Sequence, residues 1–332
     1  MKSKAAKLAL AAICLGPWMA SAAASEFSFG PYKFLPLAAE GVNPVMSTAV
    51  RGKPEAVLTP GLLPKGINTV SWAFAEGECG SETWSGLDAN KVAAANVQAF
   101  KRAGLNYVLS TGGQAGVFTC ATDAGMQAFV ARYDSPQLVG LDFDIEGKQT
   151  DAQVDSLIKR IVTLKAKRPA LRMSFTLATL AASDGSRNSL NKQGERVLNT
   201  IQKHGLKDYV INLMVMDYGP ANSGNCVVKQ GRCDMLDSAL QAAENLHTKY
   251  GIAYGQIELT PMIGMNDVVE NIFTLDDARA LGQAARLRGL AGLHYWSLDR
   301  DVGCQELAAS DRCSSVHGEP LAYGEAFTSK PQ

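Results

Sequence analysis

The sequence predicts a single (β/α)8 barrel of the α/β class, also called a TIM barrel. Eight apolar runs with strand character occur along the 332 residues, and amphipathic segments with helical spacing separate most of them. Strands that alternate with helices form parallel sheets, and eight such units in about 300 residues favour a closed barrel over an open, doubly wound sheet. No G-x-G-x-x-G follows the first run, which also counts against a dinucleotide-binding fold.

The expected elements are recognised by their apolar periodicity and by signals at their ends. The expected strands span residues 32–38, 67–75, 106–110, 138–145, 172–177, 209–216, 256–262 and 291–296. The expected helices span residues 90–102, 152–167, 190–204, 235–250 and 275–288. Thr274 stands at the N-cap position of the last helix and Gly289 comes just after its end, as helix boundaries require. Residues 39–65 are rich in Gly and Pro, which predicts an irregular first crossover.

Residues 1–24 have the layout of a signal peptide that is removed on export. Lys2, Lys4 and Lys7 precede an apolar core, and small residues up to Ala24 form a cleavage site. The apolar core is too short to span a bilayer, so we expect a secreted protein, extracellular or periplasmic, without a membrane anchor. The barrel domain is then expected over residues 25–327, followed by a short tail over residues 328–332.

Cysteine usage agrees with export. Seven cysteines become six once Cys14 is removed with the signal peptide, and an even number in an exported chain predicts disulfides. The sequence alone cannot fix the pairing, but the spacing favours Cys226 with Cys233, Cys304 with Cys313, and Cys79 with Cys120. Because the histidines are scattered and no C-x-x-C occurs, we expect no metal site and no other cofactor.

The charge balance limits the class of partner. The chain carries 32 basic and 32 acidic residues, so its formal net charge is zero. Such a chain has no excess of basic residues to recruit nucleic acid or anionic lipid, and we expect neither partner. A neutral polymer such as a polysaccharide fits this balance, and we expect a monomer.

The stretch Asp142-Phe-Asp144-Ile-Glu146 alternates acidic and large apolar residues. In a strand the three acids share one face and the two apolar residues share the other, which is expected to pack against helices. An exposed edge strand could carry a similar carboxylate ladder, and a calcium or magnesium site would also use carboxylates. Edge strands seldom have such apolar partners, however, and one straight strand offers ligands from one direction. The pattern therefore favours an acid–base site at the carboxyl end of a barrel strand.

Asp142-x-Asp144-x-Glu146 resembles the catalytic signature of glycoside hydrolase family 18, the chitinases and their relatives. The family pattern has a further Asp three residues before Asp142, where this chain has Val139. That position lies off the two-residue alternation, so all the inward-facing acids are present. The resemblance implies a (β/α)8 barrel that hydrolyses β-1,4-linked N-acetylglucosamine polymers, chitin first among them.

Two further family patterns occur at the ends of other expected strands. Ser110-Thr-Gly-Gly113 resembles the S-x-G-G box of the family, although paired glycines also suit any tight turn. Trp296 matches the tryptophan that forms the floor of the sugar site in the family. Phe74 on the second expected strand lies near the acids or in the core. We count Trp296, Phe74 and Gly113 as substrate-binding candidates.

Residues 214–219 resemble the M-x-Y-D region of the family in two alternative alignments. One alignment keeps the tyrosine as Tyr218, and the other keeps the acid as Asp217 with Met216 in place of the tyrosine. Because strand alternation from Met214 places Tyr218 on the inward face, we prefer Tyr218 as the functional tyrosine. Met216 and Asp217 are then substrate-binding candidates.

The resemblance also implies a mechanism, in which the substrate's own 2-acetamido oxygen attacks the anomeric carbon. It implies that Glu146 protonates the glycosidic oxygen and later activates water, while Asp144 and Tyr218 hold the acetamido group. Independently of the resemblance, ionising every carboxyl group of a cluster costs free energy, because like charges repel at short distance. This predicts a raised pKa for Glu146 and a proton shared by Asp142 and Asp144.

Two alternatives remain open. An endo-β-N-acetylglucosaminidase acting on peptidoglycan or N-glycans would use the same chemistry and differ in its loops. A non-catalytic chitin-binding lectin on the same fold is the other alternative, but such relatives commonly lose the acid that is present here as Glu146.

Overall fold

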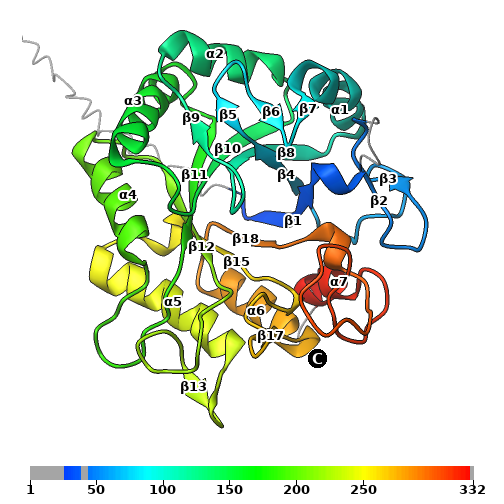
Figure 1. The fold of residues 1–332 in the computed structure, drawn as a ribbon, viewed down its shortest axis with the longest axis vertical. Coiled ribbons are helices and arrows are strands. Elements are labelled where there is room, and N and C mark those ends of the chain that lie inside the picture. Colours follow the sequence, from blue (N-terminus) through cyan, green and yellow to red (C-terminus); the bar gives the residue numbers. More distant parts are fainter. Residues whose placement is uncertain (1–25, 39–43, 330–332) are drawn as a thin grey trace, which may run out of the picture.

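The computed structural model describes residues 26–38 and 44–329, and eight parallel strands form a closed barrel in it (Figure 1). In order around the barrel the strands are β1 (Ser28–Phe34), β4 (Thr69–Ala75), β8 (Asn106–Gly112), β10 (Leu138–Ile145), β11 (Arg172–Ala178), β12 (Val210–Met214), β15 (Ile257–Thr260) and β18 (Gly292–Tyr295), which pairs back with β1. The predicted fold class is confirmed. The predicted signal peptide, residues 1–24, lies outside the described residues.

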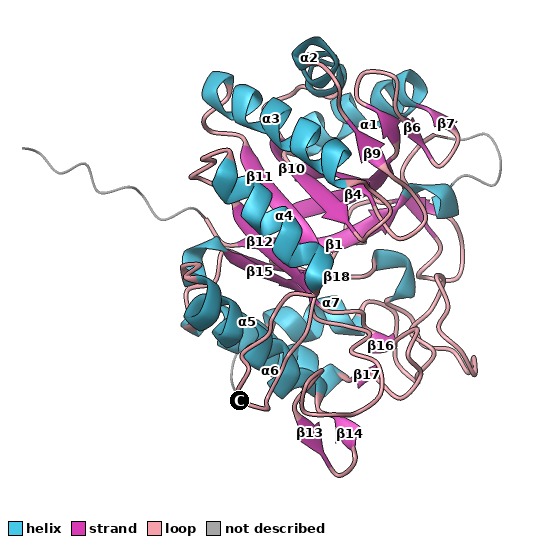
Figure 2. Ribbon diagram, turned by 60° about the vertical axis from the view of Figure 1, so that its left-hand side comes forward, coloured by secondary structure: helices cyan, strands magenta, loops and turns pink. Residues whose placement is uncertain are grey.

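Helices cover the outside of the barrel (Figure 2). They are α1 (Ala89–Ala103), α2 (Asp123–Arg132), α3 (Asp151–Lys167), α4 (Lys192–Lys203), α5 (Met235–Tyr250), α6 (Leu275–Leu287) and α7 (Ala322–Thr328). The five predicted helices are present, each within two residues of its expected bounds. Thr274 caps α6, where its side chain accepts a hydrogen bond from the backbone of Asp277. Helix α2 was not predicted because Gly125 interrupts its pattern and just three of its ten residues, Met126, Phe129 and Val130, are buried.

Loops at the strand ends contain short strands and turns. The two-residue strands are β2 (Ser47–Thr48), β3 (Glu55–Ala56), β5 (Gly77–Glu78), β6 (Thr83–Trp84), β7 (Leu87–Asp88), β9 (Phe118–Thr119), β13 (Val228–Lys229), β14 (Arg232–Cys233), β16 (Gly264–Met265) and β17 (Ile272–Phe273). The 3-10 turns are η1 (Leu35–Ala38), η2 (Tyr254–Gln256) and η3 (Leu298–Arg300).

The first strand was predicted too late in the chain. It was expected over residues 32–38 but spans Ser28–Phe34, and its last predicted residues form the turn η1 instead. Pro36 lies in that turn and has no N–H group, so the apolar run could not continue a hydrogen-bonded ladder. Of the crossover between β1 and β4, the described residues 44–68 contain turns and two short strands rather than a helix, as expected.

The interior of the barrel is polar. Inside it lie the buried side chains of Ser71, Ser110, Asp142, Ser174, Asn212, Glu258 and His294. On the outer side of β10, Phe143 and Ile145 are buried, as the alternating pattern predicted. One strand therefore carries acids into the polar interior while its opposite face anchors the helices.

The described residues contain the three predicted disulfides, Cys79–Cys120, Cys226–Cys233 and Cys304–Cys313. Each joins loop segments rather than barrel strands. Within residues 26–38 and 44–329, no helix has the length and apolar character needed to cross a membrane.

Candidate active site

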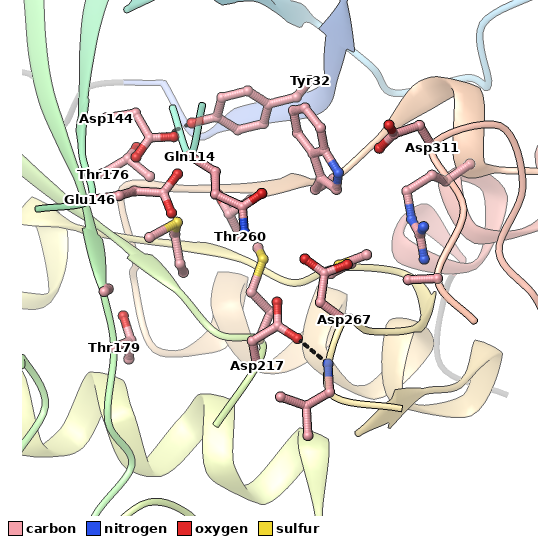
Figure 3. Close-up of a pocket in the computed structure, with 18 of the residues that line it drawn as sticks. Tyr32, Gln114, Asp144, Glu146, Thr176, Thr179, Asp217, Thr260, Asp267 and Asp311 are labelled. Atoms are coloured by element: carbon pink, nitrogen blue, oxygen red, sulfur yellow. Dashed lines mark hydrogen bonds between the residues drawn. The ribbon is translucent and has the colours of Figure 1, made fainter. Parts of the chain in front are cut away.

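A cavity of about 580 Å³ lies at the carboxyl ends of the barrel strands (Figure 3). Of the residues proposed from the sequence, Asp144, Glu146, Phe74, Met216, Asp217 and Trp296 line this cavity. Asp142, Gly113 and Tyr218 are not among its lining residues. The folded chain thus brings together six candidates from four barrel strands and the residues that follow them.

Asp142 lies beneath the cavity and is 1% exposed. Its carboxylate accepts four hydroxyl hydrogen bonds, from Tyr32 at 3.0 Å, Ser110 at 2.6 Å, Ser174 at 2.8 Å and Thr176 at 2.8 Å. Burial raises the pKa of Asp142, and these hydrogen bonds offset part of the rise because they favour the ionised form. The donors come from the adjacent strands β8 and β11 and from β1 across the barrel, so Asp142 is held by three strands.

Asp144 is 4% exposed and has a carboxyl oxygen, Oδ1, that is buried and has no hydrogen-bond partner among the described residues. Burial raises the pKa of Asp144 well above its usual range, and the nearby carboxylates Glu146 and Asp142 raise it further. An unpaired buried oxygen at the wall of a cavity is suited to a polar group of a bound molecule. That Asp142 and Asp144 share a proton stays a prediction.

Glu146 follows directly after β10 and lines the cavity. Burial raises its pKa to about 7, and the negative charge of Asp217 contributes to the rise, whereas Lys148 opposes it. A carboxyl group with such a pKa is protonated for much of the time near neutral pH. Glu146 can therefore donate a proton and later take one back, as a general acid and base must.

The raised pKa of Glu146 predicts how activity depends on pH. A general acid must be protonated in the free enzyme, so kcat/KM should fall as pH rises through about 7. The substitution Asp217→Asn removes a negative charge that raises this pKa. We therefore expect the alkaline limb of the profile of kcat/KM against pH to move to lower pH. The limb would be measured from initial rates between mildly acidic and alkaline pH. Asp151→Asn, a change at an exposed residue of α3 that does not line the cavity, should leave this limb in place, and the same limb in all three proteins would contradict the assignment.

The paired glycines at the end of β8 shape the cavity without lining it. A Cβ atom on Gly112, whose φ is +87°, would collide with the backbone oxygen of Asp144. A Cβ atom on Gly113 would lie 2.7 Å from the ring of Phe74. That ring in turn stacks on Trp296, with ring centroids 5.5 Å apart and an interplanar angle of 14°. The glycine pair therefore lets β8 approach the acids closely and leaves room for the aromatic platform.

The expectation that Tyr218 points into the cavity is wrong. Strand β12 ends at Met214, and Asp217 has a φ of +50°, so the two-residue alternation does not continue to Tyr218. Tyr218 is 3% exposed, and its backbone N–H donates to Asn271 Oδ1 at 2.9 Å. Met216 and Asp217 line the cavity instead, as in the second of the two alignments. Tyr218 therefore does not line the cavity, and its catalytic role stays a prediction.

Sequence reasoning missed several residues that line the cavity. Tyr32 on β1 and Thr176 on β11 donate hydrogen bonds to Asp142, and their places in predicted strands were the available signal. Gln114, Asp267 and Asp311 lie in loops. No periodicity identifies such positions.

One group of side chains among the described residues has the spacing of metal ligands, namely Glu78, Cys79 and Cys120. The two sulfur atoms are joined in a disulfide and are not available as thiolates. This group lies outside the cavity and does not suggest a metal centre.

The sequence is similar to two curated chitinases. It is 30% identical over 230 residues to the probable bifunctional chitinase/lysozyme of Escherichia coli (strain K12), a match that covers 62% of this chain and 24% of that protein. It is also 30% identical over 225 residues to endochitinase 11 of Metarhizium anisopliae, covering 62% of this chain and 42% of that protein. The chain thus spans less than half the length of either relative. No model of a protein family matches it.

The fold is similar to that of a solved chitinase domain. Active domain 2 of the chitinase from Pyrococcus furiosus superposes with a TM-score of 0.70 and 23% identity, over 91% of this chain and 94% of that chain. A structure of the same domain complexed with chito-oligosaccharides gives a TM-score of 0.70 and 24% identity. At this identity the match establishes the shared barrel. In sequence the chain is similar to part of two chitinases, and in fold to a chitinase domain, which agrees with its resemblance to glycoside hydrolase family 18.

Proposed function

We propose that this protein is a secreted chitinase that hydrolyses β-1,4-linked N-acetylglucosamine polymers. The proposal rests above all on one arrangement, in which Glu146 lines the cavity with a raised pKa directly after the strand that carries the buried, unpaired carboxyl of Asp144. A proton donor next to a polar anchor is what substrate-assisted cleavage of a 2-acetamido sugar requires.

In the proposed first step, the proton of Glu146 passes to the glycosidic oxygen as the bond from that oxygen to the anomeric carbon breaks. The substrate's 2-acetamido oxygen forms a new bond to the same carbon and gives a cyclic oxazolinium ion. The carboxyl of Asp144 accepts the acetamido N–H through its unpaired oxygen and stabilises the developing positive charge.

In the proposed second step, water attacks the anomeric carbon, the bond to the acetamido oxygen breaks, and Glu146 takes a proton from the water. Two displacements at one carbon retain its configuration. Trp296, backed by Phe74, offers an apolar ring face on which the sugar can lie. In the alignment that keeps Asp217, Met216 stands where the family pattern has a tyrosine, and the acetamido group is then held without that hydroxyl.

Export is part of the proposal. The signal-peptide pattern of residues 1–24 and three disulfides support a location outside the reducing cytoplasm. We propose that the exported protein acts as a monomer on chitin or chito-oligosaccharides.

The proposal is tested by incubating the mature protein with a fluorogenic N-acetylglucosamine trimer and with chitin, and by following released fluorophore and soluble oligosaccharides. We expect turnover of both. Binding without turnover would favour the lectin alternative. Release of soluble oligosaccharides from peptidoglycan or an N-glycan, but not from chitin, would favour the endo-β-N-acetylglucosaminidase alternative. The peptidoglycan arm matters because one relative is named a chitinase/lysozyme.

A further inference from the structure

The wall of the cavity opposite Glu146 is formed by two loops that a buried arginine joins. Arg300, which is 0% exposed, donates from one guanidinium nitrogen to the carbonyl oxygens of Ile263 at 2.9 Å and Met265 at 2.6 Å. Its other terminal nitrogen donates to the carbonyl oxygen of Ser310. Met265 also donates its backbone N–H to Ser314 at 2.8 Å. The hairpin of β16 and β17 and the loop closed by the Cys304–Cys313 disulfide therefore form one fixed wall, which we call the far wall.

The far wall places acidic side chains at the cavity. Asp267 of the hairpin and Asp311 of the disulfide loop both line it, on the opposite side from Asp144 and Glu146 (Figure 3). Within the part of the chain that the structure describes, neither carboxylate has a cationic side chain within the 4.0 Å of an ion pair. Asp217 adds a third carboxylate at the same end.

Among the described residues that line the cavity, Arg300 is the single cationic side chain, and its charge attracts Asp267, Asp311 and Asp217, so it offsets one of their three negative charges. Its terminal nitrogens are used by backbone carbonyls, while its Nε is buried and has no hydrogen-bond partner among the described residues. The far wall thus offers an N–H donor among three carboxylate acceptors and carries an excess of negative charge. This combination suits a polar sugar ring that carries a positive charge.

We propose that the far wall is a charge-selective sugar subsite that favours a glucosamine unit with a protonated 2-amino group. Its preferred polymer is then partly N-deacetylated chitin. The same charge disfavours polymers with carboxylates, such as the lactyl groups of peptidoglycan, because like charges across a partly buried cavity repel. The inference builds on the proposed function and names the substrate class of the same cavity. The acetamido group is needed beside Asp144 and Glu146, so the free amine belongs at the far wall.

The test measures binding rather than turnover, so that it stands apart from the test of catalysis. The protein carrying Glu146→Gln would be titrated by calorimetry, at low salt and mildly acidic pH, with fully acetylated chitohexaose and with partly deacetylated hexamers. We expect the deacetylated hexamers to bind about tenfold more tightly, and this preference to shrink as salt is added. Adding Asp267→Asn and Asp311→Asn should abolish the preference.

A matched control replaces Glu270 and Glu306 by Gln on the same background. Both are exposed, lie in the same two loops and do not line the cavity, so the change of charge is equal and the preference should survive. Equal affinity for the two hexamers in the protein with Glu146→Gln would overturn the inference. So would a preference that persists without Asp267 and Asp311, or one that the control also removes. Failure to bind either hexamer would instead contradict the proposed function itself.

Discussion

Replacing Glu146 by Gln is expected to lower kcat on a fluorogenic N-acetylglucosamine trimer by about 10³-fold. The amide keeps the shape of the side chain but cannot donate a proton to the glycosidic oxygen or accept one from water. Glu146 makes no ion pair with another described residue, so the midpoint of thermal unfolding should stay close to that of the wild type.

The measurement is a full titration of rate against substrate concentration for both proteins, with circular dichroism to verify folding. KM should change much less than kcat, because the proton transfer matters in the transition state rather than in binding. A variant that keeps more than about a tenth of the activity would show that another group is the acid.

The second large effect is expected for Asp144→Asn, which should lower kcat by about 10²-fold. The asparagine fills the same space but cannot balance the positive charge that develops on the acetamido group. Stability should not fall, because the wild-type carboxyl is buried with an unpaired oxygen and a raised pKa, both of which cost free energy in the folded state.

Asp142→Asn provides the contrast. Four hydroxyl groups donate to the Asp142 carboxylate, and an amide NH₂ cannot accept from the donors that face it. We expect a clear loss of thermal stability for Asp142→Asn and none for Asp144→Asn, measured by calorimetric unfolding. The opposite order would contradict the described hydrogen bonding.

The acidic strand illustrates what the sequence can predict. Residues 138–145 were expected as a strand, and β10 has these bounds. The prediction was possible because the two faces of the strand carry different residue types that alternate in the sequence. Acids occupy the interior face and large apolar residues the helix-covered face. The position of Trp296 at the cavity was predictable for a related reason, since it directly follows the last barrel strand.

Tyr218 and the far wall show where sequence reasoning ends. The orientation of Tyr218 depends on the left-handed backbone of Asp217, a non-glycine residue whose φ no sequence pattern marks. Asp267 and Asp311 reach the cavity because Arg300 binds backbone carbonyls of both loops, contacts that depend on chain geometry rather than on residue type. Periodicity predicts regular elements well, but it carries no information on how irregular segments meet.

The division of the cavity between rigid strands and joined loops has an evolutionary consequence. The acids proposed for chemistry lie on or directly after β10, whereas Asp267 and Asp311 lie on loops outside the barrel ladder. Because loops tolerate exchange better than strands, a descendant could acquire a new polymer preference by altering two surface segments while it inherits the reaction intact. Arg300 restricts that freedom, since any replacement loop must still present backbone carbonyls to its guanidinium.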